Sequence, residues 1–163
     1  MNEGKENEMF KTVIWATDGS EAADTSLPYA KELATGGALV VVHCKELLAG
    51  RGGSYPVLAD DDELQAKISE QVETLRGEGL DVTLRLASSH ASGAAHVIAD
   101  VANEIGADAI VVGTRGHAMI AGLVLGSVTH RLLHIAPCPI LAVPSRVAAH
   151  GAGDSERAMV AGA

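Results

Sequence analysis

Aromatic side chains and positive charge are both scarce in this chain of 163 residues. It has one Trp, two Tyr and one Phe. Proteins that bind single-stranded nucleic acid stack bases on aromatic rings, so this composition argues against that class. The 12 Lys and Arg are outnumbered by 21 Asp and Glu, giving a formal net charge of −9. DNA and anionic membranes attract cationic surfaces, so neither is expected as the main partner, although the charge says nothing against a local nucleotide site.

Long apolar runs and cysteines are also few. No apolar run reaches the roughly 18 residues of a membrane span, and the opening MNEGKENEMF has no apolar core of a signal peptide. Cys44 and Cys138 are the two cysteines, each inside an apolar strand-like run. The simplest interpretation is a reducing cytoplasm, with the thiols as small buried hydrophobes rather than redox partners. The length predicts one domain over residues 11–145, between a flexible start (1–10) and a flexible tail (146–163).

Strand-like and helix-like patterns alternate along the chain. Apolar runs predict five strands, at residues 12–17, 38–44, 81–87, 107–112 and 137–144. Helix-like segments separate them, and the glycine-rich residues 45–59 are expected to form a mobile loop. This alternation predicts an α/β fold with a five-stranded parallel sheet in the order 3-2-1-4-5, helices on both faces and right-handed crossovers, as in Rossmann-like and flavodoxin-like proteins.

The helices carry recognisable boundary signals. Ser20 is expected to cap a helix that runs to about Ala34, with Pro28 kinking it or marking a late first turn. The four acids at residues 60–63 open another helix, where negative charge is favourable, and a solvated helix start is favoured over a metal site. After a possible cap at Ser92, a third helix is expected to bury the face formed by Val97, Val101, Ala102 and Ile105 and to end at Gly106.

A glycine-rich stretch, GTRGHAMIAGLVLGS at residues 113–127, lies where a buried strand is followed by a helix. Glycine lets backbone N–H groups approach an anion and tolerates positive φ, and a helix start adds unpaired N–H groups. Gly113, Gly116 and Gly126 thus predict a phosphate cradle, with Thr114 and Ser127 as further donors. The stretch matches neither a P-loop nor a GxGxxG fingerprint, and a glycine-rich surface loop is the alternative.

Topology brings a second segment to this stretch. In a sheet ordered 3-2-1-4-5, ligands bind where the strand order reverses, between strands 1 and 4. Strand 1 ends at Asp18 and strand 4 ends at Gly113. We therefore expect an acidic side chain and the glycine stretch on opposite lips of one crevice.

The spacing Gly-x2-Gly-x9-Gly-Ser resembles the ATP-binding signature of the universal stress protein family. TVIWATDGS resembles that family's opening strand and turn, and APCPILAVP its closing strand, so the resemblance covers residues 11–144. It implies that Asp18 lies near the ribose and near Mg²⁺ or Mn²⁺ on the phosphates, as a metal ligand. It also implies that the phosphates are held by Gly113, Gly116, Gly126 and Ser127, that Cys44 meets adenine through its main chain, and that Thr17 and Arg115 line the crevice.

The same resemblance implies a homodimer paired through the last strand, Ile140–Val143 (Ile140, Leu141, Ala142 and Val143), and a role in stress response. With Arg115 but no clear catalytic base, we expect slow ATP hydrolysis at most and a nucleotide that acts mainly as a regulatory ligand. The alternatives are a nucleotide-free dimeric interaction module and a sensor of AMP or a cyclic nucleotide. Family members often carry Gly-x-Pro after the third strand, where this chain has SSHASGAA.

Histidines and serines offer weaker candidates. His130 and His134 are four residues apart on an expected helix, with His117 before it, but exposed helix histidines are favoured over a zinc site. His43 is interpreted as a satisfied core histidine. The serines and His90 in the SSHAS segment lack the GxSxG pattern of a nucleophile elbow, so loop polarity and capping are favoured over a hydrolase.

Overall fold

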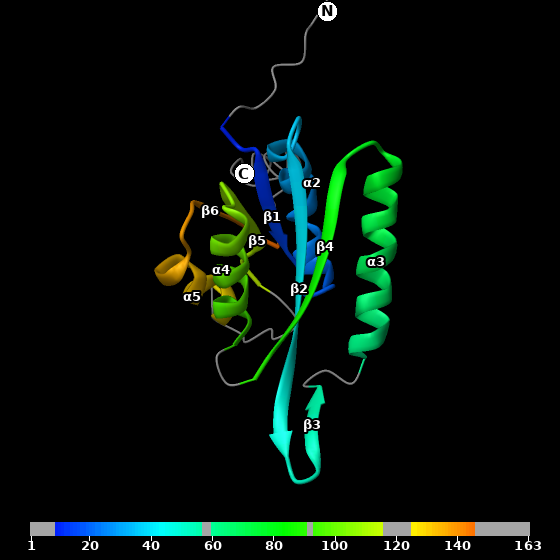
Figure 1. Ribbon diagram of the computed structural model, residues 1–163, viewed down its shortest axis with the longest axis vertical. Coiled ribbons are helices and arrows are strands. Elements are labelled where there is room, and N and C mark those ends of the chain that lie inside the picture. The colour runs from blue at the N-terminus through cyan, green and yellow to red at the C-terminus, as the bar shows by residue number, and fades with distance from the viewer. Residues whose placement is uncertain (1–8, 57–59, 91–92, 116–124, 146–163) are drawn as a thin grey trace, which may run out of the picture.

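The computed structural model describes residues 9–56, 60–90, 93–115 and 125–145, apart from the side chain of Tyr55 (Figure 1). Six strands lie in this part of the chain: β1 (Thr12–Ala16), β2 (Ala38–Gly50), β3 (Gly53–Pro56), β4 (Asp81–Ser89), β5 (Ala109–Gly113) and β6 (Ile140–Val143). The helices there are α1 (Glu21–Asp24), α2 (Leu27–Leu33), α3 (Asp61–Gly77), α4 (Gly93–Ile105) and α5 (Ser127–Ile135). The predicted flexible ends lie outside the described residues, except Met9 and Phe10.

The parallel strands follow the order β4-β2-β1-β5-β6. Numbered among themselves, these five strands have the predicted order 3-2-1-4-5. The predicted count of five is wrong, however, because β3 pairs with β2 in the antiparallel direction and makes a sixth strand. The sheet is therefore mixed, with β1 and β5 adjacent at its centre.

A β-hairpin replaces most of the mobile loop that was predicted for residues 45–59. β2 continues for 13 residues, its last four pair with β3, and Gly50 is aligned with Gly53. Gly52 and Gly53 have φ values of 105° and 142°, a region that a side chain would disfavour, so the glycines that indicated a loop instead form a tight turn. The hairpin projects beyond the rest of the sheet (Figure 1). Residues 57–59 lie outside the described part of the chain.

Two apolar cores cover the two faces of the sheet, as predicted. Successive strand residues point to opposite faces, so Val13 and Trp15 pack with α2 and α3 while Ile14 and Ala16 pack with α4 and α5. The α3 residues Ile68, Val72 and Leu75 are buried in the first of these cores. Figure 1 shows α3 beside β4 and α4 with α5 on the other side of the sheet. None of the helices in the described residues is long and apolar enough to cross a lipid bilayer.

The first predicted helix is divided into α1 and α2. Ser20 caps α1 as predicted, accepting a hydrogen bond from the Ala23 N–H. Pro28 lies in the first turn of α2, where the missing N–H costs nothing. Ser26 stands at the junction, where its hydroxyl donates to the Ala23 carbonyl and accepts from Trp15 Nε1 at 2.9 Å. The chain therefore turns between two short helices instead of kinking within one.

The buried face of α4 differs from the prediction. Val97, Val101 and Ile105 are only half-buried. The fully buried residues are instead Ala94, Ala95, Ile98, Ala99 and Ala102, of which only Ala102 was expected. A stripe of alanines lets the helix approach the sheet closely, which places the larger side chains at the margins of the contact. Gly106, with φ of 62°, ends α4 as predicted, and Ser92 lies outside the described residues.

Candidate functional site

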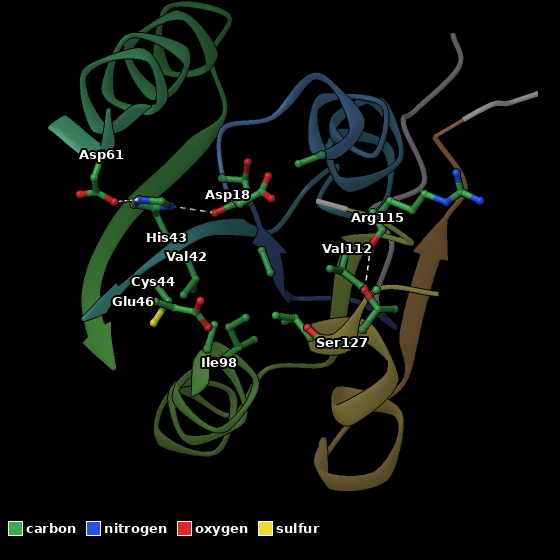
Figure 2. A pocket seen from close by; sticks show the side chains of 18 residues that line it. Asp18, Val42, His43, Cys44, Glu46, Asp61, Ile98, Val112, Arg115 and Ser127 are labelled. Carbon is green, nitrogen blue, oxygen red and sulfur yellow. Dashed lines mark hydrogen bonds and ion pairs between the residues drawn. The ribbon is translucent and has the colours of Figure 1, made fainter. Parts of the chain in front are cut away.

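A cavity of about 340 Å³ opens where β1, β2 and β5 approach α4 and α5. Asp18 and Gly113 both line it, so the two segments that topology predicted to face one crevice do so. In Figure 2, His43 and Asp61 lie on one side of the cavity, Arg115 and Ser127 lie on the other, and Asp18 lies between them. The structure brings these side chains together, and their binding roles stay predictions.

The lip around Asp18 is fixed by short-range hydrogen bonds. The Thr17 N–H donates to the Val42 carbonyl at 3.0 Å, continuing the β1–β2 ladder. Asp18 Oδ1 accepts from the Ser20 N–H at 3.0 Å and from the Ser20 hydroxyl at 2.6 Å. Gly19 makes the turn with φ of 78°, and its N–H donates to the buried Thr17 hydroxyl. These bonds hold the Asp18 carboxylate at the cavity in a defined orientation.

The opposite lip joins the end of β5 to the start of α5. Gly126 caps α5 without a side-chain hydrogen bond, and Ser127 is the first helical residue. The first N–H groups of a helix have no partner within it and attract anions. Arg115, Gly126 and Ser127 line the cavity, whereas Thr114 does not. Thr114 holds the lip instead, since its N–H donates to Val143 and its carbonyl accepts from Gly126.

The two described glycines of this lip lie at close backbone approaches, and neither has the positive φ that glycine tolerates. Gly126 has φ of −67°, and Gly113 is outside the positive region as well. A Cβ on Gly113 would lie 3.1 Å from the Ala22 carbonyl oxygen, and one on Gly126 would lie 3.2 Å from the Thr114 carbonyl oxygen. Close backbone approach therefore explains both residues. Gly116 and His117 lie outside the described residues.

The third wall is largely apolar and comes from β2 and α4. Val42, Cys44, Ala94 and Ile98 contribute to it, with Glu46 nearby (Figure 2). Burial raises the pKa of the Cys44 thiol. Burial also raises the pKa of Cys138. Both cysteines are free and half-buried, and a raised pKa disfavours the reactive thiolate form.

Sequence reasoning missed a buried ion-pair cluster at the edge of the cavity. His43 and Asp61 are 3% and 4% exposed, and His43 Nε2 lies 3.5 Å from Asp61 Oδ1. Lys45 Nζ lies 2.8 Å from Asp61 Oδ2, an interaction that raises the pKa of Lys45. The expected solvated helix start is therefore wrong for Asp61, although Asp62 is fully solvated. A histidine inside an otherwise apolar strand was the only sequence signal for this cluster.

Metal-ligating groups are sparse in the described residues, where no cluster of three or more His, Cys, Asp or Glu could hold an ion. His130 and His134 pack edge to face with ring centroids 5.1 Å apart, on the exposed side of α5. Asp18 brings one carboxylate to the cavity. Mg²⁺ commonly uses one or two carboxylates and completes its coordination with phosphate oxygens and water, so Asp18 fits a metal that arrives with a nucleotide.

The strand order and the position of the cavity define a doubly wound α/β protein with a site where the strand order reverses. Residues 9–144 match the model of the universal stress protein family, and the chain belongs to that family. A Thermus aquaticus relative, a universal stress protein in the QAH/OAS sulfhydrylase 3′ region, is 34% identical over 140 residues, covering 83% of this chain and 99% of its own.

Solved structures of universal stress proteins share the fold. One from Archaeoglobus fulgidus, in complex with dAMP, has a TM-score of 0.60 and 28% identity, covering 82% of this chain and 97% of its own. Another, in complex with cAMP, has a TM-score of 0.62 and 23% identity, covering 84% of this chain and 98% of its own. At 23% identity, the similarity to the cAMP complex shows a shared fold and nothing more.

Proposed function

We propose that this protein binds ATP in the cavity between β1 and β5, and that the nucleotide acts mainly as a regulatory ligand in a stress response. The observation that carries the proposal is the single cavity lined by the Asp18 lip, by the start of α5 and by an apolar wall from β2 and α4. These three surfaces suit a metal–phosphate group, further phosphates and a base, respectively.

The charges at the cavity support a metal-bound nucleotide. Asp18, Glu46 and Asp61 line it, and Arg115 is the cation among its described lining residues. A bare triphosphate beside three carboxylates would be repelled, and Mg²⁺ or Mn²⁺ held by Asp18 would neutralise part of that charge. Ser127 and the α5 N–H groups would bind phosphate, joined by Gly116 if the family signature applies. Cys44 would contact adenine through its main chain, with Thr17 beside it.

The first test is calorimetric titration with ATP, with and without Mg²⁺. The sharpest variants are Asp18→Asn and Ser127→Ala, because Gly113→Val would collide with the Ala22 carbonyl and confound binding with folding. Asp18→Asn is expected to weaken binding about tenfold with Mg²⁺ and much less without it. Asp81→Asn, the same change on an exposed residue at the start of β4, is the matched control.

Two outcomes oppose the proposal. If the unmutated protein, freed of any co-purified nucleotide, fails to bind ATP, the ATP assignment is wrong and the nucleotide-free interaction module becomes the better hypothesis. If Asp18→Asn weakens binding equally with and without Mg²⁺, Asp18 is not the metal ligand. ATP turnover is measured in the same samples, and only slow hydrolysis is expected because no clear base is evident.

A nucleoside monophosphate is the second candidate ligand. The Archaeoglobus fulgidus relative, at 28% identity, was solved with dAMP. If the start of α5 meets one phosphate, then AMP, dAMP or cAMP should bind at least as tightly as ATP, and Mg²⁺ should have little effect. Competition titrations compare the affinities of ATP and each monophosphate for the same site. In a triphosphate site, ATP should displace the monophosphates more readily than they displace ATP.

A further inference from the structure

The backbone that carries Asp18 is held by side chains from two other elements. The carbonyl of Thr17, immediately before Asp18, lies 3.0 Å from His43 Nδ1 on β2. The carbonyl of Gly19, immediately after Asp18, accepts from Lys67 Nζ on α3 at 2.8 Å. Lys67 also pairs with Asp24, and both side chains are half-buried. His43 is the buried member of these two contacts.

The contact with Thr17 defines how His43 is protonated. A backbone carbonyl can only accept a hydrogen bond, so Nδ1 of His43 must carry the proton and donate it. Nε2 then faces Asp61 across 3.5 Å and has no hydrogen-bond partner among the described residues. Asp61 is itself held by Lys45. The Asp61 carboxylate thus faces the far side of the ring without a hydrogen bond to it.

We infer that His43 is a positioning residue for the nucleotide site. Its Nδ1–H fixes the Thr17–Asp18 peptide, and the buried Asp61 side chain, paired with Lys45, lies against the far side of the ring. The peptide plane before Asp18 sets the direction of the Asp18 side chain, and misplacement of a binding group by a fraction of an ångström weakens a metal–phosphate contact. This inference rests on the proposed nucleotide function. It gives the buried His43–Asp61 pair a role beyond core packing and helix solvation.

Two conservative substitutions separate the two ring nitrogens. His43→Asn keeps an amide nitrogen near the position of Nδ1, whereas His43→Gln places one nearer to Nε2. ATP affinity with Mg²⁺ should stay within about threefold of the unmutated protein for Asn and fall about tenfold for Gln, the size of one lost hydrogen bond to a charged network. Asp61→Asn, which retains His43, should give an intermediate loss and serves if His43→Gln fails to fold.

A double-mutant cycle decides whether His43 acts through Asp18. In an Asp18→Asn background, His43→Gln should change ATP affinity by less than about twofold, because the side chain that it positions is already impaired. Full additivity of the two losses would overturn the inference, since it would mean that His43 affects binding only through general stability. Equal losses in His43→Asn and His43→Gln would overturn it as well.

An NMR readout without nucleotide separates this inference from the proposed function. The carbonyl ¹³C resonance of Thr17 should shift in His43→Gln and keep nearly its original value in His43→Asn. If the unmutated protein binds no nucleotide, the proposed function fails, and the Thr17 resonance still reports whether His43 holds the Asp18 peptide. An unchanged Thr17 resonance in His43→Gln would refute the hydrogen bond on which the inference depends.

Discussion

The hydroxyl of Thr129 donates a hydrogen bond to the carbonyl oxygen of Gly113 at 2.8 Å, in a buried environment. This contact joins the first turn of α5 to the last residue of β5. It fixes the helix N-terminus against the strand whose end forms the same lip of the cavity. The direction of the unpaired N–H groups of α5 therefore depends in part on the Thr129 side chain.

Replacement of Thr129 by Val, which keeps the shape of the side chain, is expected to destabilise the protein by about 1–3 kcal/mol because the Gly113 carbonyl loses a buried partner. Nucleotide affinity should fall as well, since the start of α5 is released. Chemical denaturation and ATP titration measure the two effects. Thr74→Val, which removes a similar but exposed hydrogen bond in α3, should change stability by less than about 0.5 kcal/mol.

Gly37, directly before β2, and Gly77, at the end of α3, should respond in opposite directions to alanine. A Cβ on Gly37 would lie 2.5 Å from the Lys11 carbonyl oxygen, so Gly37→Ala must displace backbone and should cost about 1–3 kcal/mol. Gly77, the last residue of α3, has open space around it, and Gly77→Ala should stabilise by about 0.5–1 kcal/mol. Thermal unfolding measures the stability of both variants. A Gly37→Ala protein as stable as the unmutated one would contradict the close approach of Gly37 to Lys11.

The thiol of Cys44 should alkylate slowly and be protected by nucleotide. Because burial raises its pKa, the folded state favours the neutral thiol at pH values where an unfolded chain already forms thiolate. The resulting stability is present below the unfolded pKa and is lost as pH rises through the folded pKa. Iodoacetamide labelling near pH 8.5, read by mass spectrometry, should be slower for native than for unfolded protein.

Cys138 is the internal control for that labelling. Its pKa is also raised, but it does not line the cavity. ATP should therefore slow modification of Cys44 and leave Cys138 unchanged. Equal protection of both thiols would indicate that nucleotide stabilises the whole fold, without occupying the wall beside Cys44.

The homodimer that the family resemblance implies should depend on β6. Among the described residues, β6 pairs with β5 alone, which leaves its other edge open to a second copy of the chain, and Leu141 is 37% exposed. Leu141→Lys places a charge on this edge strand, a change that opposes strand pairing. Sedimentation should then show a monomer, while Leu133→Lys, on the exposed side of α5, should leave the assembly unchanged. A monomeric unmutated protein would rule out this proposal.

Local patterns predicted much of the fold. Alternating apolar runs indicated the parallel strands and their order, and Ser20 and Gly106 marked helix boundaries that the structure confirms. The hairpin was missed because its glycines, which were interpreted as a loop, permit a tight turn as well. The face of α4 was misassigned because the sequence analysis weighed valines above alanines, whereas close helix–sheet packing selects the smaller residues.

The sequence by itself determined the family and the two cavity lips, because strand order places Asp18 and Gly113 at the same edge of the sheet whatever the side chains around them do. Only the tertiary structure decided that Asp61 is buried against His43, that Thr129 holds Gly113, and that Gly113 and Gly126 lie close to neighbouring backbone. These contacts join residues distant in the chain, and their existence depends on how closely helices approach the sheet, a quantity that no local periodicity encodes.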